Sequence, residues 1–388
     1  MAVLKTCEQI LVLTDYHPVM FCHITLPWCD PAKAAISITE DDRYIVALSY
    51  NFHILSRTQT IMFTSKIHDF QELRVLGRGG FGTVSLVQHN STYELYAMKS
   101  LQKEHMVLKN QVTHAKTERR VLYNTDHPFI VNMHSAFQTH DKLYMILDYC
   151  PGGDLYFHLY RMGALSKKMT RFYCAEIVLA LVYLHAEGIA HRDLKPENCL
   201  FDHSGHIKLV DFGLAKTGIR RPERGAYTKC GSLPYMAPEV VHQRGHGSAV
   251  DYWSLGVIAY EMICGRHPWY SGDGDADNYP PTAHYSPGYA KSGALWFPSF
   301  VSRCTQHFIR SLLIENPLKR IDGLRCPEHP FFAKINWRLL YSKAYVPPIR
   351  HFKVRQTNVF THAHYFSAVF YAWFPSCDIA PLTYVLLL

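Results

Sequence analysis

Along residues 70–150, apolar and polar positions alternate in short runs rich in β-branched and aromatic residues, a pattern that predicts strands. Five such runs are expected to form strands: Glu72–Leu76, Thr83–His89, Tyr93–Ser100, His127–Phe137 and Leu143–Tyr149. A glycine cluster separates the first two runs and a polar turn separates the next two. One helix, Val107–Thr125, is predicted between the third and fourth strands. This part of the chain is therefore expected to be mainly β.

After Gly152-Gly153 the apolar spacing becomes helical. Four longer segments predict helices: Asp154–Met162, Lys168–His185, Asp251–Cys264 and Phe300–Ile314. A β-rich segment thus precedes an α-rich one, with a boundary near Pro151–Asp154. Tyr44–Leu55 also has the composition of a strand but cannot be placed, and Ser271–Ser292 is expected to be an irregular insertion because it is rich in Gly, Asp, Pro and Tyr.

The composition is that of a folded globular protein. Of 388 residues, 48% are apolar and 19% are charged, which excludes a disordered, collagen-like or mucin-like chain over most of the length. The net charge of +8 is spread along the sequence and not clustered, so we expect no nucleic-acid partner.

Cysteine usage and the lack of long apolar stretches bear on cellular location. The 11 cysteines are odd in number and form no CxxC pair, which favours reduced thiols in the cytoplasm or nucleus over disulfides or a zinc site. The N-terminus carries Lys5 and Glu8 without a clean apolar core, so a signal peptide is not expected. No stretch reaches the roughly 18 apolar residues of a membrane-spanning helix, so stable membrane insertion is not expected.

Gly77-Arg78-Gly79-Gly80-Phe81-Gly82 has the spacing GxGxxG. Glycines let the backbone approach a phosphate closely, and their N–H groups can donate to it. The pattern alone is compatible with a phosphate-covering loop, a plain β-turn or a Rossmann dinucleotide site. Because Thr83–Val87 continues as a strand and not as a helix, the Rossmann interpretation is the weakest of the three.

Lys99 lies on the predicted strand that follows the turn. A lysine on an apolar strand is usually an outward, solvated residue, and that interpretation stays open here. The alternative is an ion pair with Glu118 of the following helix, which would direct the ammonium at nucleotide phosphates.

The most specific signal is the run His191-Arg192-Asp193-Leu194-Lys195-Pro196-Glu197-Asn198, followed by Asp211-Phe212-Gly213 and then Ala237-Pro238-Glu239. Phosphoryl transfer needs an aspartate that orients the attacking hydroxyl and accepts its proton. It also needs oxygen ligands for Mg²⁺, which Asn198 and Asp211 can supply. The order and spacing of all three motifs make a chance match improbable.

With these motifs, the chain resembles a eukaryotic protein kinase from Phe70 to Phe332. The resemblance implies an α+β, two-lobed fold, with a small β-rich lobe over residues 70–150, a larger α-helical lobe over 151–332 and ATP in the cleft between them. Residues 1–69 would be an N-terminal extension of unknown role. Residues 333–388 would be a C-terminal tail that becomes atypical after about residue 358.

The family's functional positions map onto this sequence residue by residue. The ATP-binding positions are Leu76, Gly77, Arg78, Gly79, Gly80, Phe81, Gly82, Val84, Ala97, Lys99, Leu147, Asp148, Cys150, Asp154 and Leu200. Glu118 would hold Lys99, Asp193 would be the catalytic base, and Lys195 would steady the γ-phosphate. Asn198 and Asp211 would hold Mg²⁺. The structural positions are a stacked spine of Leu122, Met133, His191 and Phe212, a pair between Glu239 and Arg320, and a brace for the catalytic loop at Asp251.

Lys195, two residues after the base, resembles serine/threonine kinases and not tyrosine kinases. Several segments are similar to the AGC group near its Akt and ribosomal-protein kinase branches: His127–Val131, Phe137–Thr139, Leu143–Leu155, Gly231-Ser232, His329–Phe332 and Val346–Pro348. Asp154, Glu197 and Glu261 match the acids with which that group binds basic residues of protein substrates. The alternative is three ordinary solvated acids.

Thr228 matches the activation-loop threonine, and His114, Arg192 and Lys216 match the residues that grip its phosphate. The resemblance implies a monomeric enzyme and a separate upstream activating kinase. The sequence departs from the family at Leu233-Pro234, where Pro-Glu is usual, and in a slightly longer activation segment, Asp211–Glu239. It also departs at the end of the tail, which lacks the hydrophobic motif. The alternative function is therefore a weakly active kinase or a pseudokinase scaffold of the same fold.

Overall fold

A computed structural model of the chain describes residues 3–6, 9–12, 65–79, 82–269 and 295–350. The chain divides into two compact units, residues 1–59 and 60–388. In the first unit, β1 (Val3–Thr6) and β2 (Gln9–Val12) pair antiparallel. The predicted strand at Tyr44–Leu55, the insertion at Ser271–Ser292 and the tail beyond residue 350 lie outside the described residues.

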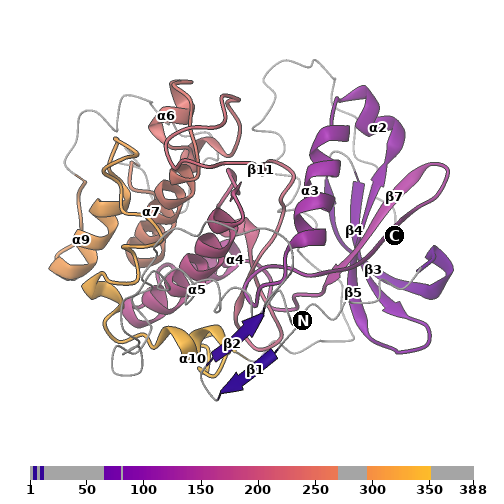
Figure 1. The fold of residues 1–388 in the computed structure, drawn as a ribbon, viewed down its shortest axis with the longest axis horizontal. Coiled ribbons are helices and arrows are strands. Elements are labelled where there is room, and N and C mark those ends of the chain that lie inside the picture. Colours follow the sequence, from indigo (N-terminus) through magenta and orange to yellow (C-terminus); the bar gives the residue numbers. More distant parts are fainter. Residues whose placement is uncertain (1–2, 7–8, 13–64, 80–81, 270–294, 351–388) are drawn as a thin grey trace, which may run out of the picture. The chain divides into compact units, whose positions relative to one another are not determined.

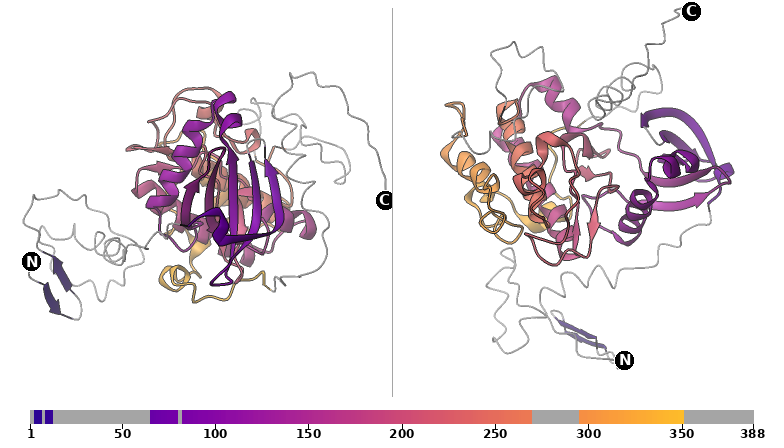
Figure 2. Two further views of the ribbon diagram at one scale, coloured as in Figure 1. Left: turned by 90° about the vertical axis from the view of Figure 1, so that its right-hand side faces the viewer. Right: turned by 90° about the horizontal axis from the view of Figure 1, so that it is seen from above.

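The second unit begins, after the short helix η2 (Ile67–Asp69), with a five-stranded antiparallel sheet in the order β3-β4-β5-β7-β6. Its strands are β3 (Phe70–Gly79), β4 (Gly82–His89), β5 (Leu95–Gln102), β6 (Met133–Gln138) and β7 (Lys142–Asp148). Apolar side chains on these strands form a buried cluster of Val87, Met98, Tyr144 and Ile146. Figure 2 shows this sheet face-on in its left view.

The fourth predicted strand is partly wrong, since β6 begins at Met133 and not at His127. The apolar residues before Met133 are buried, but their backbone groups form hydrogen bonds outside the five-stranded sheet. The Val131 N–H donates to the Leu209 carbonyl at 3.0 Å, and the Leu209 N–H donates to the Phe129 carbonyl at 2.9 Å. Leu209 belongs to β10 (Ile207–Leu209), so this apolar run joins the sheet lobe to the helical lobe.

The predicted helix Val107–Thr125 is also corrected, because two helices occupy its place. These are α2 (Lys103–Leu108) and α3 (Val112–Asn124). Between them Asn110 has a φ of +53°, a left-handed conformation that asparagine tolerates better than most residues and that ends a helix. α3 lies beside the sheet (Figure 1) and buries Glu118, Val121 and Leu122.

The helical lobe is built around two long helices that contact each other (Figure 1). Its helices are α4 (Leu155–Met162), α5 (Lys167–Ala186), α6 (Pro238–Val241), α7 (Ala249–Cys264), α9 (Arg303–Leu312) and α10 (Trp337–Tyr341). α5 is apolar and long enough to pass a length-and-composition test for a membrane span. Because 67% of the tested window is buried inside the protein, it is better described as a core helix.

Short elements carry the sequence motifs between these helices. They are β8 (Ile189–Ala190), η3 (Pro196–Asn198), β9 (Cys199–Phe201), β10, β11 (Lys216–Thr217), η4 (Leu233–Tyr235) and η5 (Pro330–Phe332). β9 pairs with β10, and β8 pairs with β11, both antiparallel. The motif at residues 191–198 therefore follows β8, and the motif at residues 211–213 follows β10.

A buried ion pair fixes the helical lobe internally. The Arg320 guanidinium is 1% exposed and donates to both carboxylate oxygens of Glu239, at 2.7 and 3.0 Å. It also donates to the backbone carbonyls of Ile314, Ala249 and Glu315. Since every side of the guanidinium has an acceptor, the charge is compensated despite its burial.

Candidate active site

Lys99 and Glu118 form the ion pair that the sequence left open. Lys99 lies on β5, and its Nζ is 2.6 Å from Oε1 and 2.8 Å from Oε2 of Glu118 on α3. The Lys99 side chain is 22% exposed, so it is not the outward, solvated lysine of the alternative interpretation. Burial alone would lower the pKa of Lys99, but the carboxylates of Glu118 and Asp211 outweigh it and raise the pKa, which keeps the ammonium charged.

Asp211 brings the two lobes together at this ammonium. Its Oδ1 lies 3.6 Å from the Lys99 Nζ, although the two residues belong to different lobes. The charge of Lys99 lowers the pKa of Asp211, so the carboxylate is ionised at neutral pH. Asp211 has a φ of +61°, an unfavourable conformation for a non-glycine residue that neighbouring contacts must maintain.

Asp193 lies on a loop whose backbone is anchored by the side chain of Asp251. The Asp251 carboxylate is buried and accepts from the backbone N–H groups of His191 and Arg192, at 2.9 and 2.8 Å. The side chain of His185 also contacts it, with Nε2 2.7 Å from Oδ2. This is the brace that the family resemblance implies. The part played by His185 was not found from the sequence, because a histidine near the end of an apolar helix carries no specific signal.

Three side chains orient the Asp193 carboxylate. Ser232 donates to Oδ1 from both its backbone N–H and its hydroxyl, at 2.8 and 2.7 Å. The Lys195 Nζ lies 3.0 Å from Oδ2 and donates to the Ser232 hydroxyl oxygen at 2.8 Å. Asn198 donates from its amide nitrogen to the Asp193 Oδ2 at 3.3 Å and to the Asp193 backbone carbonyl at 2.8 Å. The contact of Ser232 was missed by sequence reasoning, since its only signal is a hydroxyl residue after Gly231.

The donor set is suited to Mg²⁺. Because the Asn198 amide nitrogen is directed at Asp193, the side-chain oxygen of Asn198 is its remaining acceptor, and the Asp211 side chain is 51% exposed. Both residues offer the hard oxygen ligands that Mg²⁺ prefers. Within the described ranges, no three His, Cys, Asp or Glu side chains form a metal cluster.

The glycine cluster joins two antiparallel strands, so it is not a Rossmann loop that opens a helix. Gly79 pairs with Gly82 across β3 and β4, while Gly80 and Phe81 lie outside the described residues. A Cβ on Gly82 would lie only 1.8 Å from the Ser100 carbonyl oxygen, whereas a Cβ on Gly79 would meet no atom of the described residues closer than 3.9 Å. The close approach of β5 therefore requires glycine at position 82.

The predicted ATP-binding residues come from both lobes. Val84 and Ala97 lie on the adjacent strands β4 and β5, and Leu147 on β7 is paired with Ala97. Leu200 lies on β9 in the helical lobe and forms an isolated bridge with Asp154. The segment that joins the two lobes begins at Asp148, the last residue of β7. The contact of these residues with the nucleotide stays a prediction.

The Asp148 carboxylate joins the lobes directly. Its Oδ1 is 2.7 Å from the His134 Nε2 of β6, and its Oδ2 is 3.0 Å from the buried Lys208 Nζ of β10. Lys208 also donates to the Ile130 carbonyl at 3.0 Å. These contacts fix the start of the hinge segment that includes Cys150.

Residues of the predicted spine are buried between the lobes. Leu122 is 2% exposed and Phe212 is fully buried. The rings of His191 and Phe212 are 4.9 Å apart between centroids. Met133 packs against the buried cluster of Leu101, Met106 and Met145. Phe212 is thus packed inward, which is consistent with the placement of its neighbour Asp211 beside Lys99.

The three predicted substrate-binding acids influence one another electrostatically. Asp154 caps α4 and accepts from the Phe157 N–H at 2.7 Å. The Glu197 Oε2 is buried and accepts no hydrogen bond from any residue the structure describes. Burial raises the pKa of Glu197, and Asp154 raises it further. Burial and the nearby Glu197 raise the pKa of Glu261 to about 8, although Tyr235 donates to Glu261 at 2.9 Å.

The predicted phosphosite lies on an exposed stretch of the activation segment. Thr228 is exposed, and the neighbouring Ala226 exchanges backbone hydrogen bonds with His246, at 2.9 and 2.8 Å. Of the predicted phosphate-gripping residues, Lys216 is exposed on β11 and His114 lies on α3. Arg192 donates to the Leu214 carbonyl at 2.7 Å. Their grip on a phosphorylated Thr228 stays a prediction.

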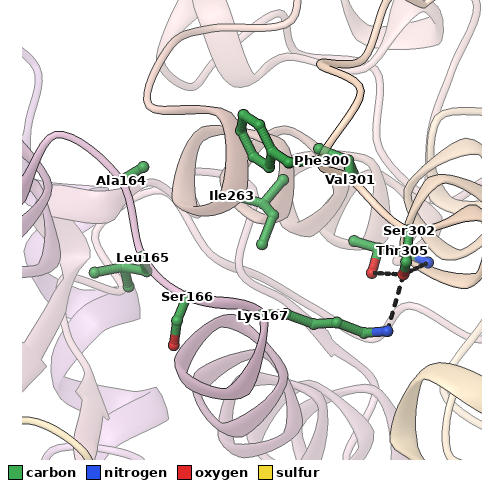
Figure 3. A pocket seen from close by; sticks show the side chains of 9 residues that line it. All are labelled: Ala164, Leu165, Ser166, Lys167, Ile263, Phe300, Val301, Ser302 and Thr305. Atoms are coloured by element: carbon green, nitrogen blue, oxygen red, sulfur yellow. Dashed lines mark hydrogen bonds between the residues drawn. The ribbon is translucent and has the colours of Figure 1, made fainter.

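A pocket of about 300 Å³ lies elsewhere, at the start of α5 and α9 (Figure 3). In it the Lys167 Nζ donates to Ser302, whose hydroxyl also caps α9. Its lining contains none of the residues predicted to bind ATP, metal or substrate: Ala164, Leu165, Ser166, Lys167, Ile263, Phe300, Val301, Ser302 and Thr305.

Comparison with known proteins agrees with this geometry. The family model described as "Protein kinase domain" matches residues 70–332. The chain is 43% identical to Protein kinase 3 of Dictyostelium discoideum over 296 residues, which cover 73% of this chain and 32% of that protein. It is 42% identical to the RAC family serine/threonine-protein kinase homolog of the same organism over 285 residues, covering 73% and 62%.

A human relative gives a similar result. The chain is 42% identical to RAC-beta serine/threonine-protein kinase of Homo sapiens over 291 residues, which cover 73% of this chain and 58% of that protein. The chain thus spans between 32% and 62% of the length of these curated relatives.

Proposed function

The chain belongs to the protein kinase family, and on this premise we propose that it transfers the γ-phosphate of ATP to serine and threonine hydroxyls of protein substrates. The observation that carries the proposal is the setting of Asp193. Its carboxylate is oriented by Ser232 and Lys195, on a loop anchored by Asp251, in a site that also contains Lys99 and Asp211.

The residues divide the chemistry between them. Asp193 orients the substrate hydroxyl and accepts its proton as the oxygen attacks phosphorus. Lys195, next to that carboxylate, places a positive charge where the γ-phosphate is transferred. Lys99, held by Glu118, binds the α- and β-phosphates. Asn198 and Asp211 hold Mg²⁺, which when bound neutralises phosphate charge.

The test is incorporation of labelled phosphate from ATP into an arginine-rich peptide. We expect transfer by the wild type and a loss of about 10²- to 10⁴-fold in Asp193→Asn, the usual range for removing a general base. Asp141→Asn is the matched control, because this aspartate is 75% exposed on the turn between β6 and β7. Equal signals from wild type and Asp193→Asn would refute catalysis at this site and favour the scaffold alternative.

We further propose that the substrates are basic around the phosphorylated residue. The buried and unsatisfied Glu197 oxygen supports this, since a substrate guanidinium would supply the missing donors. Asp154 adds to the negative potential at Glu197, and Glu261 adds to it where it is ionised. A peptide array should show a preference for Arg or Lys before the phosphorylated residue, and Glu197→Gln should weaken it. A preference for acidic or proline-containing sites would contradict the proposal.

Thr228 is proposed as the activating phosphosite, with a separate upstream kinase as the enzyme that modifies it. A phosphate there would add nearly two negative charges to an exposed stretch, and Arg192 and Lys216 are the proposed cationic partners. We also propose a monomeric protein in the cytoplasm or nucleus. Light scattering of the purified chain and imaging of the tagged full chain test those two statements.

A further inference from the structure

The loop Gly231–Met236 joins the catalytic aspartate to α6. At one end Ser232 donates to Asp193. At the other, the Tyr235 carbonyl accepts from the Ser254 hydroxyl at 2.8 Å, and the Tyr235 hydroxyl donates to Glu261. The middle of the loop is Leu233-Pro234, where the sequence departs from the family pattern. Because Pro234 has no N–H group, its carbonyl is the only backbone hydrogen-bonding group at that residue.

That carbonyl is bound by His267. The His267 Nε2 lies 2.8 Å from the Pro234 carbonyl oxygen. The backbone hydrogen bonds of η4 are accepted by the carbonyls of Ser232 and Leu233 and not by that of Pro234. The Trp269 N–H points at the His267 Nδ1, at 3.5 Å. With an acceptor at one nitrogen and a donor at the other, the tautomer assigned from these contacts carries its proton on Nε2.

The His267 ring is itself fixed. It is 8% exposed and lies between aromatic rings, with centroids 5.9 Å from Tyr235 and 5.5 Å from Trp269. Trp269 is in turn stacked on Trp253 at 5.3 Å. Burial lowers the pKa of His267 to about 4, so the ring is neutral near pH 7. A neutral, immobilised ring is a fixed hydrogen-bond donor.

We propose that His267 is a positioning residue that sets the loop Gly231–Met236 through the Pro234 carbonyl. Leu233 lies between that anchor and Ser232, and its side chain is 40% exposed. A shift of Pro234 therefore moves Leu233, the exposed loop residue next to the catalytic contact. Because Ser232 contacts the proposed catalytic base, His267 thereby controls affinity for the peptide substrate and selectivity for the residue beside the phosphorylated one. This rests on the proposed function.

The experiment compares His267→Phe, which keeps a ring without the donor, with His267→Gln, whose amide can restore a donor at similar reach. In His267→Phe we expect the peptide KM to rise about three- to tenfold, the range that one net hydrogen bond supplies. The KM for ATP should stay within twofold. Peptides that differ only in the residue after the phosphorylated one should lose their ranking. His267→Gln should recover most of the wild-type KM and ranking.

The control is His140→Phe, because His140 is 98% exposed on the turn between β6 and β7. If His267→Phe is too unstable to assay, His267→Leu replaces it as the donor-lacking variant. An unchanged peptide KM and ranking in the donor-lacking variant, or equal losses in the Gln and donor-lacking variants, would overturn the inference. A wild type that transfers no phosphate would overturn the proposed function and this inference with it, and so is distinguishable from failure of the inference alone.

Discussion

The Lys99 ammonium lies 2.6 Å from Oε1 of Glu118, and this contact ties α3 to the middle of the sheet. A lysine held in this way is aimed at a fixed point, which in a nucleotide site is where phosphate oxygens must bind. Glu118 thus acts on catalysis through the position of Lys99.

Glu118→Gln should reduce kcat/KM for ATP by about 10- to 100-fold, the effect of losing a hydrogen bond between charged groups. The amide still fits the site but no longer neutralises the ammonium. Steady-state kinetics with varied ATP measure the effect. Glu104→Gln serves as the control, because that glutamate is exposed at the start of α2. Similar kcat/KM values in the two variants would contradict a role for the pair.

Gly82→Ala should destabilise the protein more than Gly79→Ala. The new methyl group at position 82 would overlap the Ser100 carbonyl, and overpacking of this kind typically costs about 1–3 kcal/mol. At position 79 the methyl group meets no close neighbour. Thermal unfolding of both variants checks the difference. Equal melting temperatures would show that β5 does not restrict position 82.

The peptide KM should fall as pH rises toward 8. The pKa of Glu261 is raised to about 8, so below that pH much of the group is protonated and cannot pair with a guanidinium. The same shift means that this group stabilises the fold less as pH rises from its usual pKa of 4.5 to about 8. Kinetics of an arginine peptide between about pH 6 and 8 test the binding effect. Glu261→Gln should flatten the dependence, and an equally steep curve in that variant would assign the effect to another group.

Glu239→Ala should lower the free energy of unfolding by about 3–5 kcal/mol, because it leaves the buried Arg320 charge without its partner. Asp322→Ala is the comparison, since Asp322 pairs with Arg325 at 3.3 Å where both side chains are largely exposed. That pair should contribute less than about 1 kcal/mol. Denaturant unfolding of both variants measures the two values, and comparable losses would argue against the buried pair as a stabilising feature.

Thr228→Ala should lower activity well below that of the phosphorylated wild type, because no phosphate can then recruit the proposed cationic partners. Phosphosite mapping of the purified protein shows whether Thr228 is occupied. Thr217→Ala is not a suitable control, since Thr217 bonds to Arg120 of α3. Ser91→Ala, on the exposed turn after β4, is the better choice. Unchanged activity in Thr228→Ala would reject this mode of control.

The sequence determined the chemistry and the class of fold. The predicted two-lobed α+β kinase fold and the resemblance to Akt-like serine/threonine kinases are confirmed, and four of the five sheet strands lie close to their predicted positions. These features could be predicted because strand periodicity and motif order are local properties of the chain. The charged residues of the motifs also have few roles other than phosphoryl transfer when they occur in that order.

Tertiary structure alone decided the features that depend on distant partners. The apolar run before Met133 bonds to Leu209 and so does not extend β6, and the left-handed Asn110 separates α2 from α3. The contacts of Ser232 with Asp193 and of His267 with Pro234 were not found from the sequence. The physical reason is that a hydrogen bond between residues far apart in the chain leaves no periodic trace in either segment. Its existence depends on how the helices and strands between them pack.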